Sequence, residues 1–270
     1  LDEGLTWTKY TQNPVLKHSG EQDFRDPKVF WHKDSSKWIM TLATGDRIKL
    51  FSSSNLKNWQ FESEFKPEEK TELGVWECPD LFQMEDEKSG AKKWILIVNH
   101  GDKAPNGGSG GRYFVGDFDG KTFTKTQDPI WLDYGTDFYA AVTFSNLPSN
   151  RHVLLGWMSN WHYAGKVPTD PWRSAMTLPR ELSLQGDRII QTPVIHPNGF
   201  PEVSFTTQEG AIRICESDQR YVEIGVRNQK LYVDTSRAWN DLDAPTLQEI
   251  AIEKGEIDIR VIVDRGSVEV

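Results

Sequence analysis

Residues 27–38 read P-K-V-F-W-H-K-D-S-S-K-W, and residues 79–94 read P-D-L-F-Q-M-E-D-E-K-S-G-A-K-K-W. Both stretches contain a proline, a short apolar run, a polar turn and a lysine–tryptophan pair, in the same order. The runs I-M-T-L-A-T-G-D (39–46) and I-L-I-V-N-H-G-D (95–102) follow them directly. Short apolar runs that alternate with turn residues predict β-strands, so the chain carries a repeated unit of several strands.

The repeat has a period of about 50 residues, since 52 residues separate Pro27 from Pro79. A weaker third copy follows, with D-F-Y-A-A-V-T-F at 137–144 and H-V-L-L-G-W-M-S-N-W at 152–161. Units of this length with several short strands are typical of the blades of a β-propeller, whereas a β-sandwich would give shorter and less self-similar spacing. The first part of the chain is therefore predicted to be an all-β propeller.

The pattern changes after Leu184. Residues 185–203 contain prolines and glycines with little periodicity, which predicts a linker or packing segment between domains. Alternation returns over residues 204–270 and indicates sandwich strands. We therefore expect a propeller domain over residues 1–190 and a β-sandwich domain over residues 191–270.

Composition excludes several classes of function. The 270 residues are 37% hydrophobic and 26% charged, which is typical of a folded chain. The formal net charge of −9 and the lack of a basic stripe argue against nucleic-acid binding. No apolar run approaches the roughly 20 residues of a membrane span. Cys78 and Cys215 lack the paired spacing of a zinc site. The 11 tryptophans suit sugar stacking as well as core packing.

Two carboxylates occupy nearly matching places in the repeat. Asp26 directly precedes the first proline, and Glu77 lies two residues before the second. The first strand of each propeller blade lines the central channel, so we expect Asp26 and Glu77 to face one another at one end of it. Paired carboxylates with aromatic neighbours are what glycoside hydrolysis requires, and Trp76 predicts an apolar shield beside Glu77. Alternatively, the two carboxylates cap strand ends or pair with a basic neighbour such as Arg25.

The chain also resembles a known family. The resemblance rests on F-R-D-P-K-V-F-W (24–31), W-E-C-P-D-L-F (76–82), D-Y-G-T-D-F-Y-A-A (133–141) and G-W-M-S-N-W (156–161). These segments are similar to those of glycoside hydrolase family 32, the β-fructofuranosidases that include levanases, exo-inulinases and invertases. The resemblance covers essentially the whole chain. It implies a five-bladed β-propeller followed by a C-terminal β-sandwich, and a retaining hydrolysis of terminal fructose units that needs no metal and no cofactor.

The resemblance also implies roles for individual residues. Glu77 matches the general acid/base of the family, Asp26 its transition-state stabiliser, and Arg25 an arginine that contacts the substrate. Trp161 matches a tryptophan at the fructose subsite. Cys78 either tunes the surroundings of Glu77 or is a small buried hydrophobic residue.

The implied partner is a fructan, levan or inulin, or sucrose, with neither nucleic acid nor membrane as a partner. The implied location is extracellular or at the cell envelope. The sequence leaves the linkage preference, exo or endo attack and the oligomeric state open. It also leaves two alternatives: an inverting propeller glycosidase with Asp26 as its base, and a carbohydrate-binding propeller without catalysis.

The chain departs from the family pattern in one respect. The nucleophile of the family is the aspartate of a Trp-Met-Asn-Asp-Pro-Asn-Gly type of segment, which does not occur in this sequence. The pairs Asp128-Pro129 and Asp170-Pro171 lie where the family has other loops. We therefore expect residues 1–270 to be an internal portion of a longer enzyme, lacking the N-terminal blades and part of the sandwich.

The missing segment generates a first prediction. A retaining mechanism requires a nucleophile on the face of the sugar opposite Glu77, so the 270-residue chain alone is expected to hydrolyse levan, inulin and sucrose far more slowly than an intact family member. The measurement is the fructose released by the purified chain, beside the same chain extended upstream. Comparable rates would place the nucleophile within residues 1–270.

Overall fold

The computed structural model describes residues 2–18, 20–67, 73–195, 199–238 and 244–270. Two short 3-10 helices, Pro148–Asn150 (η1) and Ala164–Lys166 (η2), are the helical elements of these residues, and all other elements are β-strands. This confirms the all-β prediction. None of the described helices is long and apolar enough to cross a membrane.

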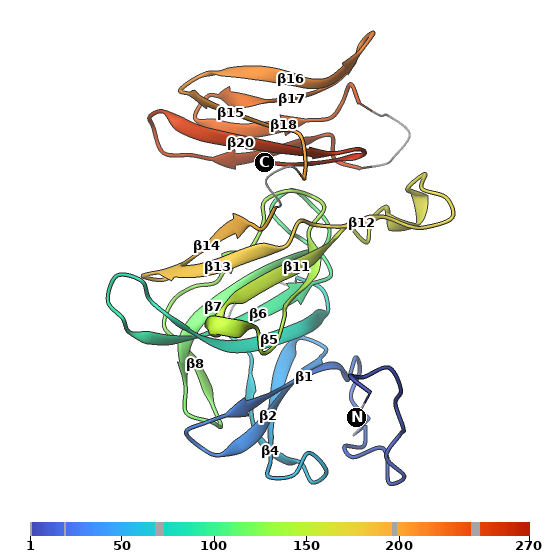
Figure 1. The fold of residues 1–270 in the computed structure, drawn as a ribbon, viewed down its shortest axis with the longest axis vertical. Coiled ribbons are helices and arrows are strands. Elements are labelled where there is room, and N and C mark those ends of the chain that lie inside the picture. The colour runs from blue at the N-terminus through green and yellow to red at the C-terminus, as the bar shows by residue number, and fades with distance from the viewer. Residues whose placement is uncertain (1, 19, 68–72, 196–198, 239–243) are drawn as a thin grey trace.

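The first three sheets follow one another along the chain and are stacked in that order (Figure 1). The first contains β1 (Arg25–His32), β2 (Lys37–Thr44), β3 (Arg47–Ser53) and β4 (Gln60–Phe65). The second contains β5 (Trp76–Glu85), β6 (Lys92–His100), β7 (Gly110–Phe118) and β8 (Phe123–Lys125), with β9 (Ile130–Trp131) paired to β7. The third contains β10 (Tyr139–Thr143), β11 (His152–Met158), β13 (Arg180–Gln185) and β14 (Arg188–Pro193), with β12 (Ala175–Met176) paired to β11. Each sheet begins in one copy of the predicted repeat, including the weaker third copy.

Two further sheets follow and lie together at the top of Figure 1. One contains β15 (Glu202–Thr207), β20 (Ile257–Asp264) and β21 (Ser267–Glu269). The other contains β16 (Gly210–Ser217), β17 (Arg220–Arg227), β18 (Lys230–Asp234) and β19 (Leu247–Ala251). The expected linker near 185–203 begins inside the third sheet, because Gly186 and Asp187 form the β13–β14 turn and 188–193 form β14. Residues 196–198 of that segment lie outside the described residues.

The middle sheet of the first three is buried on both faces. Successive side chains of a strand point to opposite faces. Leu96 and Val98 of β6 accordingly join the core shared with the first sheet, which also includes Ile39 and Ile48. Ile95 and Ile97 join the core shared with the third sheet. Full burial of such side chains stabilises a fold by about 1.5–3 kcal/mol each. Because alternate residues of β6 are buried on its two faces, they help to hold the second sheet between the first and the third.

The same irregularity occurs near the start of β1, β5 and β10. Asp26, Cys78 and Ala140 have left-handed φ values of 57°, 48° and 51°. The pairing register shifts at these points, between Arg25 and Lys28 in the first sheet and at the corresponding places of the other two. A bulge re-aims the side chains beside it. The three first strands therefore start with the same local geometry, which makes residues 25, 77 and 139 equivalent.

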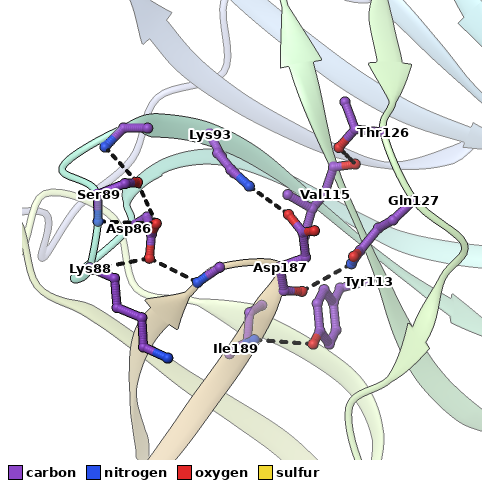
Figure 2. A network of polar contacts seen from close by, with 12 residues as sticks. Asp86, Lys88, Ser89, Lys93, Tyr113, Val115, Thr126, Gln127, Asp187 and Ile189 are labelled. Carbon is purple, nitrogen blue, oxygen red and sulfur yellow. Dashed lines mark hydrogen bonds and ion pairs between the residues drawn. The ribbon is translucent and has the colours of Figure 1, made fainter.

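A polar network fastens the β13–β14 turn to the second sheet (Figure 2). The Asp86 carboxylate accepts hydrogen bonds from the backbone N–H of Gly186, at 2.8 Å, and from the Ser89 hydroxyl. Lys93 Nζ lies 2.5 Å from Asp187 Oδ1. The backbone N–H of Ile189 donates to the Tyr113 hydroxyl at 3.1 Å. The third sheet is thus attached through polar contacts as well as through its core.

Asp86 generates a pH-dependent prediction. The Ser89 hydroxyl first, and then backbone N–H groups led by that of Gly186, lower the pKa of Asp86 to about 2. An unfolded aspartate titrates near pH 3.9, so the stabilisation by the carboxylate is complete above about pH 4 and is lost as pH falls through 2.

In Asp86→Asn, an amide NH₂ group replaces a carboxylate oxygen that accepts hydrogen bonds from Ser89 and Gly186, so the variant should have a lower free energy of unfolding at pH 7. The gap in free energy of unfolding between wild type and variant should narrow as pH falls from about 4 to about 2. Urea denaturation at several pH values measures this, with exposed Asp128→Asn as the control. If the difference in free energy of unfolding between wild type and Asp86→Asn did not change with pH, the lowered pKa of Asp86 would be contradicted.

Candidate active site

Three side chains meet where β1, β5 and β10 begin, since Arg25 and Tyr139 are the first residues of β1 and β10 and Glu77 is the second residue of β5. Arg25 Nη2 lies 3.1 Å from Glu77 Oε1. The Tyr139 hydroxyl donates a hydrogen bond to the other oxygen, Glu77 Oε2. Both oxygens of this carboxylate are therefore held by the equivalent residues of the neighbouring sheets.

Tyr139 remains a hydrogen-bond donor over the ordinary pH range. Burial first, and then the hydrogen bond to Glu77 and the charge of that carboxylate, raise the pKa of the Tyr139 phenol. The Glu77 side chain is 20% exposed, so it is shielded yet reachable from solvent. A carboxylate fixed in this way can transfer a proton to or from a bound molecule at a defined point.

Asp26 lies one residue beyond Arg25 and contacts the equivalent residue of the next sheet. Its Oδ2 accepts a hydrogen bond of 2.9 Å from the backbone N–H of Cys78, and the Cys78 Sγ lies 3.7 Å from the same oxygen. Asp26 is thus held beside the backbone of the residue that follows Glu77. That Asp26 and Glu77 face one another across one end of a central channel stays a prediction.

Two buried polar residues on the second strands support the bulges. The Thr41 hydroxyl of β2 donates to the Pro79 carbonyl at 3.3 Å. The Asn99 side chain of β6 accepts from the backbone N–H of Ala141 at 3.0 Å and donates to the carbonyl oxygens of Cys78 and Ala141 at 3.4 and 3.3 Å. Bulges leave backbone groups without ladder partners, and these side chains satisfy them.

Trp161 lies on the same side of the molecule as Tyr139. Its ring centroid is 6.4 Å from that of Tyr139 and 5.1 Å from that of Trp157, and the residue is 59% exposed. The preceding Asn160 is buried and donates to the carbonyl oxygens of Thr136 and Gly107. This anchoring presents the Trp161 ring to solvent beside the Glu77–Tyr139 pair.

The close approach of Asn160 explains one glycine of the neighbouring loop. A Cβ at Gly108 would lie 2.0 Å from Asn160 Oδ1, and Gly108 has a φ of +69°. A larger residue would displace the amide that anchors Trp161.

One expectation about this site is wrong. Trp76 was predicted to shield Glu77, yet its ring packs in the core against His100, at 5.0 Å, and against Phe114. Consecutive residues of a strand point to opposite faces, so Trp76 points away from the Glu77 carboxylate. Tyr139, which the sequence analysis did not single out, covers the carboxylate instead. Tyr139 lies in the third copy of the repeat, at the position equivalent to Glu77 in the second copy.

Further along the same strands, a polar cluster joins the three sheets. Lys28 Nζ lies 3.3 Å from Asp80 Oδ2 and donates to the Thr143 carbonyl at 2.7 Å. Asp80 Oδ2 also accepts from the N–H and the hydroxyl of Thr143, both at 2.7 Å. These residues border a cavity of about 540 Å³ whose lining does not include Glu77, Asp26 or Trp161. We therefore assign the candidate site to the beginning of β1, β5 and β10, where Glu77 and Asp26 lie.

Within the described residues, no group of three or more His, Cys, Asp or Glu side chains is arranged to hold a metal ion. The chemistry considered below uses the carboxylates and their neighbours.

Comparisons with known proteins identify relatives of the chain. Residues 1–193 match the sequence model of the glycosyl hydrolases family 32 N-terminal domain. A levanase of Bacillus subtilis is 43% identical over 321 residues, an alignment that covers 100% of this chain and 47% of the levanase. An extracellular exo-inulinase of Aspergillus niger is 43% identical over 204 residues, covering 68% of this chain and 38% of the relative. The chain thus spans about half of these curated relatives or less.

A solved structure agrees with these matches. The crystal structure of an exo-inulinase from Aspergillus awamori superposes with a TM-score of 0.86 at 31% identity, covering 99% of this chain and 64% of that one. The likeness extends over all five sheets.

The surroundings of Cys78 generate a prediction about its reactivity. Burial first, and then the charges of Asp26 and Glu77, raise the pKa of the Cys78 thiol to about 12. Only the thiolate reacts, so at pH 8 Cys78 should be alkylated about 10³-fold more slowly than a free thiol. Iodoacetamide labelling of a Cys215→Ser variant, followed by mass spectrometry, measures this rate. The exposed Cys215 of a Cys78→Ser variant is the control, and equal rates would contradict the prediction.

Proposed function

The chain belongs to glycosyl hydrolase family 32, and on this basis we propose that the protein releases fructose from fructans or sucrose with Glu77 as its general acid/base. The observation that carries the proposal is the Glu77 carboxylate, held between Arg25 and Tyr139 at the start of three equivalent strands. General acid catalysis requires a carboxyl group that is fixed within reach of the leaving oxygen. The levanase and exo-inulinase relatives support the choice of a fructan as substrate.

The proposed mechanism has two steps. Glu77 donates its proton to the leaving glycosidic oxygen as the bond to the fructose anomeric carbon breaks, and later removes a proton from the attacking water. Arg25 and Tyr139 keep the carboxyl group in place through both steps. A retaining mechanism also needs a nucleophile on the opposite face of the sugar, and we assign that role to none of residues 1–270.

We assign the other site residues to binding. Asp26 accepts hydrogen bonds from fructose hydroxyls, contacts that strengthen as the ring flattens in the transition state. Arg25 contacts the same sugar, and Trp161 offers it an apolar face. The two alternatives, an inverting glycosidase with Asp26 as the base and a binding propeller without catalysis, are not favoured by the names of the relatives.

The proposal includes the finer architecture. We assign the first three sheets to blades of a five-bladed β-propeller and the last two to a β-sandwich, because stacked four-stranded sheets with equivalent first strands are typical of blades. The boundary then falls between β14 and β15, close to the predicted domains 1–190 and 191–270. We also propose an extracellular or cell-envelope location, since one relative is named an extracellular exo-inulinase.

The function is tested by Glu77→Gln in the full-length protein. Glutamine keeps the size of the side chain and removes the proton, so kcat on levan, inulin or sucrose should fall about 10²- to 10⁴-fold while binding persists. The matched control is Glu85→Gln at the other end of β5. Turnover within a few-fold of wild type for Glu77→Gln would contradict the assignment of the acid.

A further inference from the structure

The side chain of Asn106 connects the β16–β19 sheet to the segment that precedes β10. Asn106 Oδ1 accepts a hydrogen bond of 3.2 Å from the backbone N–H of Glu249 in β19. Asn106 Nδ2 donates to the carbonyl oxygen of Tyr134. Because β19 is the last strand of its sheet, its outward backbone groups need partners from outside the sheet. Both ends of the Asn106 amide are therefore used, and the proposed mechanism gives this residue no role.

The residues that follow Asn106 hold the backbone of Trp161. The Gly107 carbonyl accepts a hydrogen bond of 3.1 Å from Asn160 Nδ2, and the Ser109 N–H donates to Asn160 Oδ1 at 3.3 Å. The Ser109 hydroxyl accepts a hydrogen bond of 3.2 Å from the N–H of Trp161. Ser109 and Asn160 are each only 1% exposed. Trp161 is therefore held, directly and through the residue before it, by residues within three positions of Asn106.

The turn that contains Asn106 is closed by its own backbone. The Ala104 N–H donates to the Gly108 carbonyl at 2.9 Å, and the Gly107 N–H donates to the Ala104 carbonyl at 2.8 Å. A turn closed by hydrogen bonds across it moves as a unit. A displacement of Asn106 therefore shifts the Gly107 carbonyl, to which the Asn160 amide is bound.

Asn106 and Asn160 also fasten this turn to the segment that leads into the candidate site. Asn106 donates to the Tyr134 carbonyl, and Asn160 Nδ2 donates to the Thr136 carbonyl, two residues later, at 2.9 Å. Three residues after Thr136 comes Tyr139, whose hydroxyl binds the proposed acid/base and whose ring lies 6.4 Å from that of Trp161. The two asparagines thus fix the Trp161 backbone relative to the start of β10.

We propose that Asn106 is a positioning residue, through which the β16–β19 sheet fixes the Trp161 ring beside Tyr139. This inference rests on the proposed function, in which Trp161 offers the sugar an apolar face. The bridge needs an amide, because one side chain has to accept from the Glu249 N–H and donate to the Tyr134 carbonyl at the same time. Alanine removes both contacts, and aspartate removes the donor alone.

The test is a double-mutant cycle in the full-length protein. Asn106→Ala should lower kcat/KM for sucrose about tenfold, mainly through KM, because the sugar loses its contact with a displaced Trp161. Trp161→Ala should lower it at least as much. In the Trp161→Ala background, Asn106→Ala should lower kcat/KM by less than about twofold, because the residue that Asn106 positions is gone. The matched control is Lys230→Ala, which removes an ion pair of 2.8 Å with the Glu249 carboxylate but leaves the Glu249 N–H, and should keep the wild-type kcat/KM.

Hydrogen exchange measured by mass spectrometry provides a readout that does not depend on turnover. The Trp161 N–H donates to the Ser109 hydroxyl, so its exchange reports whether that contact persists. Peptides that contain residues 160–163 should exchange about tenfold faster in Asn106→Ala than in wild type or in Lys230→Ala. Asn106→Asp repeats both measurements if Asn106→Ala does not fold.

Two results overturn the inference. If the losses from Asn106→Ala and Trp161→Ala add in the double variant, or if residues 160–163 of Asn106→Ala exchange at the wild-type rate, Asn106 only joins two sheets and does not position Trp161. A wild-type protein that hydrolyses neither sucrose nor fructan would instead contradict the proposed function. The exchange rates would then still decide whether Asn106 holds Trp161 in place.

Discussion

The geometry of the candidate site depends on one backbone constraint, the bulge near the start of β1, β5 and β10. Asp26, Cys78 and Ala140 hold left-handed φ values, a conformation that costs a residue with a Cβ about 1–2 kcal/mol. The surrounding sheets offset that cost, because Thr41 and Asn99 satisfy backbone groups that the bulges leave without ladder partners. Strain of this kind concentrates at functional sites. Here it directs Arg25 and Tyr139 onto the Glu77 carboxylate.

The stack of sheets in turn keeps the three bulges in register with one another. The Lys28–Asp80 pair and Thr143 join the first strands just beyond the bulges, and the two apolar cores fill the space between the sheets. At the other side of the third sheet, Arg180 binds Asp133 at 2.7 Å and Glu269 of β21 at 2.8 Å. The contact with Glu269 attaches the sheet of β15, β20 and β21 to the third sheet. The site is therefore built by packing between sheets, since no single sheet contains it.

Much of this could be predicted from the sequence, because prolines mark the first two copies of the repeat. Pro27 and Pro79 made Asp26 and Glu77 recognisable as near-equivalent carboxylates. Tyr139 escaped notice because Ala141 stands where the other copies have proline, so the third copy could not be aligned residue by residue. Trp76 does not shield Glu77, although the two are adjacent in sequence, because successive side chains of a strand point to opposite faces. Part of the expected linker proved to be strand β14, since Gly186 and Asp187 act as a hairpin turn that joins two strands of one sheet.

The central claim is that Glu77 protonates the leaving group, and the dependence on leaving-group acidity tests it most directly. A good leaving group departs without protonation, so loss of a general acid matters little for it. The full-length Glu77→Ala variant should lose about 10²- to 10⁴-fold in kcat/KM on sucrose but retain most of its kcat/KM on a fructofuranoside with a nitrophenol leaving group. This is because kcat/KM reports the step in which the leaving group departs, whereas kcat should fall on both substrates since Glu77 also activates the water. An equal loss of kcat/KM on both substrates would contradict the account, because Glu77 would then act on something other than the departing oxygen.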